Sequence, residues 1–125
     1  MIIDTNALSA FADGNADAVG EIDRASLLAI PVIVLGEYRF GIAQSRRKAD
    51  YERWLTETLS RATVLDVGLE TSARYAEIRL ELKGAGTPLP TNDTWIAALC
   101  RQHGLPLLSR DKHFDSVAGV RRLSW

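Results

Sequence analysis

The stretch PTNDTWIAALC (residues 90–100) places turn-forming residues directly before an apolar helical pattern. Asp93 therefore lies at the start of a predicted helix that continues to about Gln102. Unpaired backbone N–H groups at such a helix start carry partial positive charge. The simplest interpretation of Asp93 is an N-cap, because aspartate is favoured at that position. A second interpretation needs other acidic residues to lie nearby in the fold.

Short apolar segments alternate with helical patterns along the rest of the chain. Strands are predicted at residues 1–4, 27–30, 63–66, 105–109 and 120–125, and helices at residues 5–12, 16–24, 32–44, 48–61 and 69–83. In the last of these helices, one apolar side is predicted, formed by Ala73, Ala76, Ile78, Leu80 and Leu82. This alternation predicts a single α/β domain over residues 1–125, with a mostly parallel sheet of four to five strands and helices on both faces.

Composition narrows the class of protein. The chain has 125 residues, 46% of them hydrophobic and 25% charged, with a net charge of −1. This balance is ordinary for a globular domain and lacks the basic excess of many nucleic-acid binders, although a local basic patch is compatible with it. The single Cys100 excludes an internal disulfide and a cysteine-based zinc site. No signal peptide or membrane-spanning run is recognisable, so we expect a cytoplasmic protein.

Four acidic residues are predicted to converge at one edge of the sheet. Asp4 and Asp111 directly follow predicted strands, Asp93 begins a helix, and Glu37 lies on a helix that closely follows the second strand. Sites in open parallel sheets form at the carboxyl ends of the strands. Two carboxylates about 4 Å apart repel by roughly 4 kcal/mol at an effective dielectric constant of about 20. A hard divalent cation such as Mg²⁺ or Mn²⁺ would relieve this repulsion and support phosphodiester hydrolysis.

Each of these residues also has a structural interpretation. Asp4 could cap the following helix, and Asp111 could be a turn residue. Glu37 could be a surface acid paired with Arg39 or Arg46. The spacing of the acids does not decide between these alternatives.

A set of motifs, taken in order along the chain, resembles a known family, and this resemblance favours one of the two interpretations of the acidic residues. The set comprises IIDTN (residues 2–6), PVIVLGE (31–37) with RFG (39–41), AEIR (76–79), NDTWIAA (92–98) and LSRD (108–111) with His113 and Phe114. In this order and over essentially the whole chain, they resemble a PIN domain, and specifically the VapC ribonuclease toxins of bacterial toxin–antitoxin pairs. The resemblance implies an α/β/α sandwich whose acidic cluster binds Mg²⁺ or Mn²⁺ and cleaves RNA.

Carried over position by position, the resemblance assigns roles to individual residues. Asp4, Glu37, Asp93 and Asp111 match the catalytic acids, with Asp4, Asp93 and Asp111 expected at the metal. Thr5 and Ser109 match polar residues that hold the carboxylates or a metal-bound water, and Asp115 matches a further acid of some members.

The resemblance also implies partners. Family members form homodimers and are inhibited by a VapB antitoxin, often through an inserted basic residue. Such a residue can neutralise the carboxylates that hold the metal. For the RNA substrate, candidate phosphate contacts are Arg46, Arg47, Lys48 and Arg110.

Three other classes share parts of this pattern. A receiver domain needs a lysine near a late strand end, which we cannot place. A haloacid-dehalogenase-type phosphatase needs Asp-x-Asp after the first strand, where this chain has Asn6. A binding-only PIN-like module would keep the acids for the fold, and the full quartet argues against it.

Overall fold

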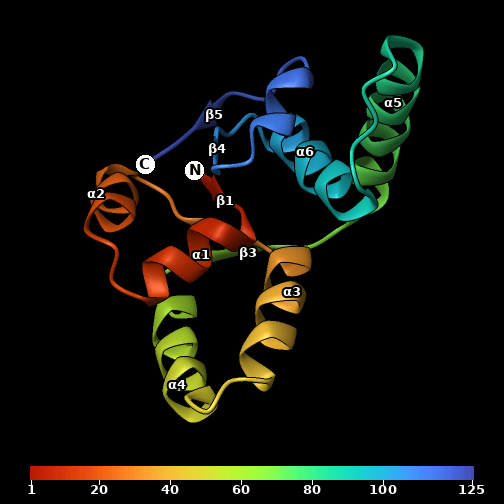
Figure 1. Cartoon of the computed structure of the whole chain (residues 1–125). Coiled ribbons are helices and arrows are strands. Elements are labelled where there is room, and N and C mark those ends of the chain that lie inside the picture. Colours follow the sequence, from red (N-terminus) through yellow and green to blue (C-terminus); the bar gives the residue numbers. More distant parts are fainter.

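The computed structural model describes residues 1–125 and contains five strands, six α-helices and one 3₁₀ helix (Figure 1). The strands are β1 (Ile2–Ile3), β2 (Ala29–Pro31), β3 (Thr63–Leu65), β4 (Leu107–Leu108) and β5 (Arg122–Leu123). The helices are α1 (Thr5–Ala12), α2 (Ala16–Arg24), α3 (Val32–Ala43), α4 (Lys48–Leu59), α5 (Leu69–Ala85), α6 (Thr91–His103) and the 3₁₀ helix η1 (Lys112–Ser116).

The five strands form one parallel sheet in the order β3-β2-β1-β4-β5. β1 is central, with Ile2 in register with Ala29 on one side and Leu107 on the other. Right-handed crossovers place α1 to α4 on one face and α5 and α6 on the other, and Figure 1 shows these two groups on opposite sides of β1. The predicted parallel α/β architecture is therefore confirmed, with shorter strands than predicted because their outer residues turn into the connections.

The core lies between the sheet and both helical layers. Ile2, Ile3, Leu107 and Leu108 are completely buried, as expected for strands covered on both faces. From α6, residues 96–100 are buried on all sides of the helix, including Cys100, whose thiol pKa burial raises to about 12. None of the helices is both long and apolar enough to span a membrane.

Helix α5 departs from the single apolar side that the sequence pattern predicts. Ile78 and Leu82 are buried against the molecule, whereas Ala76 is exposed and Leu80 is 74% exposed. Two residues along a helix correspond to a rotation of about 200°, so Ile78 and Leu80 must point to opposite sides. The prediction of one apolar side was therefore wrong, and α5 presents a second apolar face outward.

The start of α6 also differs from the prediction. The helix begins at Thr91, and its N-cap is Pro90, which offers no side-chain hydrogen bond. Asp93 is the third residue of the helix and does not cap it, and neither Thr91 nor Asn92 does so. The Thr94 hydroxyl donates to the Pro90 carbonyl oxygen at 2.9 Å and so satisfies none of the free N–H groups of this turn. The carboxylate of Asp93 is thereby left without a capping role.

Candidate active site

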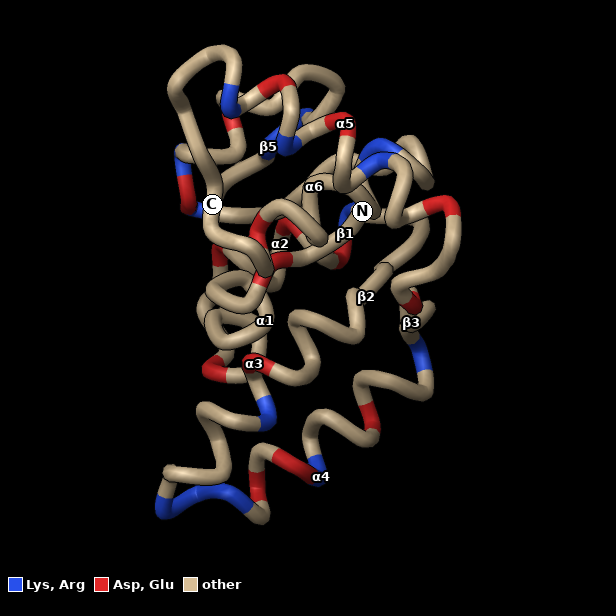
Figure 2. The backbone as a smooth tube through the Cα atoms, turned by 90° about the vertical axis from the view of Figure 1, so that its right-hand side faces the viewer, with Lys and Arg blue, Asp and Glu red and all other residues tan.

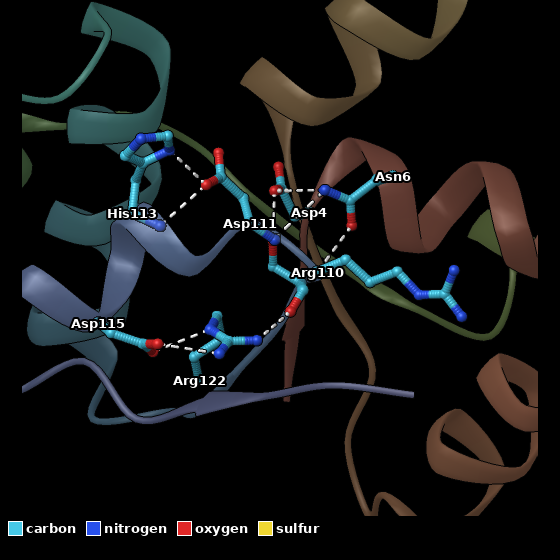
Figure 3. A network of polar contacts seen from close by, with 8 residues as sticks. Asp4, Asn6, Arg110, Asp111, His113, Asp115 and Arg122 are labelled. Carbon is cyan, nitrogen blue, oxygen red and sulfur yellow. Dashed lines mark hydrogen bonds and ion pairs between the residues drawn. The ribbon is translucent and has the colours of Figure 1, made fainter.

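Asp4 lies at the end of the central strand and is held by three hydrogen bonds, of which Figure 3 shows the one from Asn6. Its Oδ1 accepts from the backbone N–H of Thr5 at 2.8 Å, which caps α1. Its Oδ2 accepts from the Ser109 hydroxyl at 2.7 Å and from the Asn6 side-chain amide at 3.1 Å. Burial raises the pKa of Asp4, these hydrogen bonds oppose the rise, and the charge of Asp111 adds to it.

Ser109 joins Asp4 to Asp111 across neighbouring strands. Besides donating to Asp4, the Ser109 hydroxyl accepts from the Asp111 backbone N–H at 3.0 Å. Asp111 caps η1, since its Oδ1 accepts from the His113 backbone N–H at 2.9 Å, and the same oxygen lies 2.7 Å from His113 Nδ1. Asp111 thus has the predicted turn role and still lies in the group around Asp4.

Asn6 and His113 also belong to this network, although the sequence pattern predicts a site role for neither of them. The Asn6 amide donates to Asp4 and, at 3.4 Å, to the Ser109 hydroxyl, while its Oδ1 accepts from the Arg110 backbone N–H at 3.3 Å. Asn6 therefore ties α1 to the loop after β4. Its position two residues after Asp4 in the DTN motif is the only local signal for this role.

Asp93 and Glu37 approach the same group from α6 and α3. Burial raises the pKa of Asp93 to about 6, and the charges of Asp4, Asp111 and Glu37 add to this shift while His113 opposes it. Burial also raises the pKa of Glu37, with the charge of Asp4 as the second cause. Glu37 pairs with no cation, so the alternative of an ion pair with Arg39 or Arg46 is not realised. Four acids from separate segments therefore share one electrostatic environment.

The donor set suits a hard divalent cation, although no three acidic, histidine or cysteine side chains lie close enough together to hold a metal ion. Carboxylate oxygens dominate the site, which favours Mg²⁺ or Mn²⁺ over softer metals. The Thr5 hydroxyl is buried beside Asp4 and has no hydrogen-bond partner of normal geometry. It lies on the side of Glu37, where it opposes the rise in the pKa of that residue. The mutually repelling carboxylates are the kind of donor set that a cation with its water shell would neutralise.

Asp115 faces away from this group (Figure 3). Both of its oxygens pair with Arg122, at 2.8 and 2.9 Å, and Arg122 also donates to the Ser109 carbonyl oxygen at 3.0 Å. This ion pair lowers the pKa of Asp115. Asp115 therefore supports the site only indirectly, by holding η1 against β5.

The basic residues singled out in the sequence lie in two different places. Arg46, Arg47 and Lys48 form the turn between α3 and α4, at the far end of the two helices (Figure 2). Because α3 has 12 residues, roughly 18 Å of helix separates this turn from the carboxyl edge of the sheet. Arg110 instead lies next to Asp111, with its guanidinium 4.6 Å from the centre of the Trp125 ring. Of the four, only Arg110 adjoins the carboxylates.

Comparison with known proteins identifies the family and the fold. The family model described as the PIN domain matches residues 1–120. Ribonuclease VapC4 of Mycobacterium tuberculosis is 32% identical over 93 residues, covering 73% of this chain and 72% of the relative. The chain belongs to the PIN-domain family. Within it, the chain is also similar to Ribonuclease VapC2 of Rickettsia felis, at 26% identity over 99% of this chain and 96% of the relative.

Solved structures extend the likeness of this PIN domain to three dimensions. VapBC from Salmonella typhimurium, crystallised bound to DNA, superposes with a TM-score of 0.87 at 25% identity, covering 99% of this chain and 96% of that one. VapBC2 from Rickettsia felis, bound to a DNA fragment from its promoter, gives a TM-score of 0.89 over 99% and 97% of the two chains. At 22% identity, the second comparison shows the fold alone.

Proposed function

We propose that this PIN domain is a Mg²⁺- or Mn²⁺-dependent endoribonuclease and the toxin of a type II toxin–antitoxin pair. The observation that carries the proposal is the electrostatic environment of Asp93, whose pKa is raised by burial and by the charges of Asp4, Asp111 and Glu37 from three other segments of the chain. Burial and neighbouring negative charges raise the pKa values of Asp4, Glu37 and Asp93, so a cation beside them would be stabilising. The curated relatives with ribonuclease names support RNA as the substrate.

Asp4, Asp93 and Asp111 would hold the metal, and their side chains would have to draw closer together to do so, since no three such side chains lie close enough without it. When bound, a divalent ion at such a site supplies an activated water and stabilises charge on the phosphate. The hydrogen bonds from Ser109 and Asn6 orient Asp4 in advance, so that little reorganisation is needed.

Glu37 would act as a proton acceptor. It has no ion-pair partner, it is exposed at the edge of the cluster, and its raised pKa favours taking a proton at a side-chain oxygen. The Thr5 hydroxyl would orient the attacking water, because it is buried beside Asp4 and adjoins Glu37. Arg110 would contact an RNA phosphate beside the cluster, and Arg46, Arg47 and Lys48 would contact more distant phosphates.

The natural inhibitor would be a VapB-type antitoxin. Several structural neighbours are VapBC complexes, which supports such a partner. A guanidinium group from the antitoxin would compete with the metal for Asp4 and Asp93, since it pairs with carboxylates in a bidentate manner. In the cytoplasm, this contact would keep the nuclease inactive.

A homodimer would use the outward apolar face of α5, formed by Leu69, Ala73, Ala76 and Leu80. Leu69 and Leu80 are 91% and 74% exposed, the two most exposed large apolar side chains of the chain. A groove of about 640 Å³ continues this face toward Pro88 and Leu89. A second copy is the occupant expected from the resemblance, and covering this face would remove the exposed leucines from water.

The proposal is tested by RNA cleavage with Asp4→Asn and Asp93→Asn. Both variants should lose metal-dependent cleavage, while Asp23→Asn, which changes an exposed acid on α2, should keep it. Wild-type cleavage should stop in EDTA and return with Mg²⁺ or Mn²⁺. Equal cleavage by all proteins, with and without EDTA, would contradict the assignment. Absence of cleavage by metal-loaded wild type on all RNA classes would favour the binding-only module.

A further inference from the structure

A small polar pocket lies between α1, α3 and α4, outside the carboxylate cluster. It has a volume of about 170 Å³, and its polar lining comes from Ser9, Asp13, Tyr38, Ser45 and Tyr51. Figure 1 shows α3 and α4 projecting together from the sheet, with α1 beside them. The pocket therefore opens on the helical layer opposite α5 and α6.

The floor of the pocket contains a buried hydroxyl group without a partner. Tyr38 is only 4% exposed, and its Oη makes no hydrogen bond. The Trp54 ring packs against the Tyr38 ring, with centroids 6.2 Å apart, and Phe11 packs edge-on against Trp54 at 5.2 Å. These rings hold the hydroxyl in place. A buried polar group in a native fold normally has a partner, so the Tyr38 hydroxyl indicates a ligand that would supply one.

The rim of the pocket carries an acid without a cation. Tyr51 donates to Asp13 Oδ1 at 2.8 Å, which leaves Asp13 Oδ2 free, and Asp13 is in no ion pair. The nearest cation, Arg47, lies over the Tyr51 ring at 5.2 Å from its centre and pairs with Asp50 at 4.0 Å. The pocket thus combines hydrogen-bond acceptors, a negative charge and two aromatic rings.

We propose that this pocket binds one arginine side chain of a partner polypeptide. A guanidinium group has several donors and no acceptor, which matches Asp13 Oδ2 and the Tyr38 oxygen, and it packs well on tyrosine rings. A volume of about 170 Å³ accommodates one long side chain. Burial is the main cause that raises the pKa of Tyr38 to about 12, so the Tyr38 hydroxyl is uncharged at neutral pH and Asp13 supplies the negative charge of the pocket. This site does not depend on the nuclease activity.

The test is a titration of the full chain with N-acetyl-arginine methylamide. Binding is monitored through the NMR signal of the Trp54 indole N–H. We expect a saturable shift at millimolar concentrations and binding at least about tenfold weaker for the neutral citrulline analogue. Asp13→Asn and Tyr38→Phe should each weaken binding, whereas Asp17→Asn, on exposed α2, should not. Because the Tyr38 hydroxyl has no partner, Tyr38→Phe should also leave the melting temperature unchanged or higher.

Three results would overturn the proposal. The first is the absence of a saturable shift, which would mean that the pocket holds only water. The second is equal binding of the arginine and citrulline compounds or unchanged binding by Asp13→Asn. The third is tighter binding of spermidine than of the arginine compound, which would identify a small polyamine site.

Discussion

The hydroxyl group of Ser109 donates a hydrogen bond of 2.7 Å to Asp4 Oδ2, joining the ends of β4 and β1. Both residues are buried, and 105 positions separate them in the chain. This bond, the Asn6 amide and the Thr5 backbone N–H keep a buried carboxylate satisfied at the centre of the candidate site.

Ser109→Ala should therefore destabilise the fold. The substitution leaves Asp4 Oδ2 with one weaker partner and removes the acceptor of the Asp111 backbone N–H. We expect a loss of about 1–3 kcal/mol in the free energy of unfolding, measured by urea denaturation. Ser116→Ala, at the exposed end of η1, is the control and should change stability by less than about 0.5 kcal/mol. Equal effects of the two substitutions would show that the Ser109 bond contributes little.

Asp93→Asn should stabilise the metal-free protein at neutral pH. The folded pKa of Asp93 is raised from 3.8 to about 6, so folding favours its protonated form. Its charge thus destabilises the fold increasingly as pH rises from about 4 to about 6 and by a constant amount above that. After allowance for the partial exposure of Asp93, the substitution should raise the free energy of unfolding by about 1 kcal/mol above pH 6 and by almost nothing at pH 4.

Thermal unfolding in EDTA at pH 4 and pH 7.5 measures this difference. Asp23→Asn provides the matched change at an exposed position and should show no such pH dependence. A lower melting temperature for Asp93→Asn at pH 7.5 would mean that the Asp93 carboxylate has mainly a structural role in α6.

Mn²⁺ should stabilise the wild-type protein in the absence of RNA. A ligand that binds only the folded state adds about 2.7 kcal/mol at a concentration one hundred times its dissociation constant. Asp4→Asn and Asp93→Asn should abolish the shift in melting temperature, while Glu37→Gln should reduce it less. If Mn²⁺ raised the melting temperature of the Asp93→Asn protein as much as that of the wild type, the metal would bind at a site that does not include Asp93.

Asp115 and Asp111 should behave differently in RNA cleavage. Because both Asp115 oxygens pair with Arg122, Asp115→Asn should retain activity within a few-fold of wild type. Asp111→Asn should lower activity much more, since Asp111 contributes charge at Asp93 and Asp4. Steady-state cleavage rates at saturating metal measure both effects. Comparable losses would place Asp115 in the catalytic group.

Leu80→Asp should convert a dimer to a monomer. The side chain is 74% exposed on the outward face of α5, so the substitution should leave the fold intact while placing a charge in the proposed interface. Phe40→Asp, at a residue 73% exposed on α3, is the matched control. Light scattering coupled to gel filtration measures the mass. A monomeric wild type, or a dimer of the Leu80→Asp protein, would exclude this interface.

Much of the architecture was predictable because side-chain periodicity is a local property. The alternation of buried strands and helices over the chain predicted the parallel sheet, and the position of Asp4 directly after β1 placed it at the carboxyl edge. The roles of individual acids were harder to predict. Asp4 and Asp111, treated as possible ligands, also cap α1 and η1, whereas Asp93, first interpreted as a cap, caps nothing.

The remaining features depend on contacts between distant segments. The Asn6 bonds to Ser109 and Arg110 cross more than 100 residues of sequence, and no local pattern encodes them. The division of α5 into a buried and an exposed apolar face depends on where α6 packs. Local sequence thus determined the helices, the strands and the edge at which the acids lie. The tertiary structure decided which carboxylates lie near one another. It also decided that Asp115 pairs with an arginine away from them, because burial and charge interactions depend on neighbours in space.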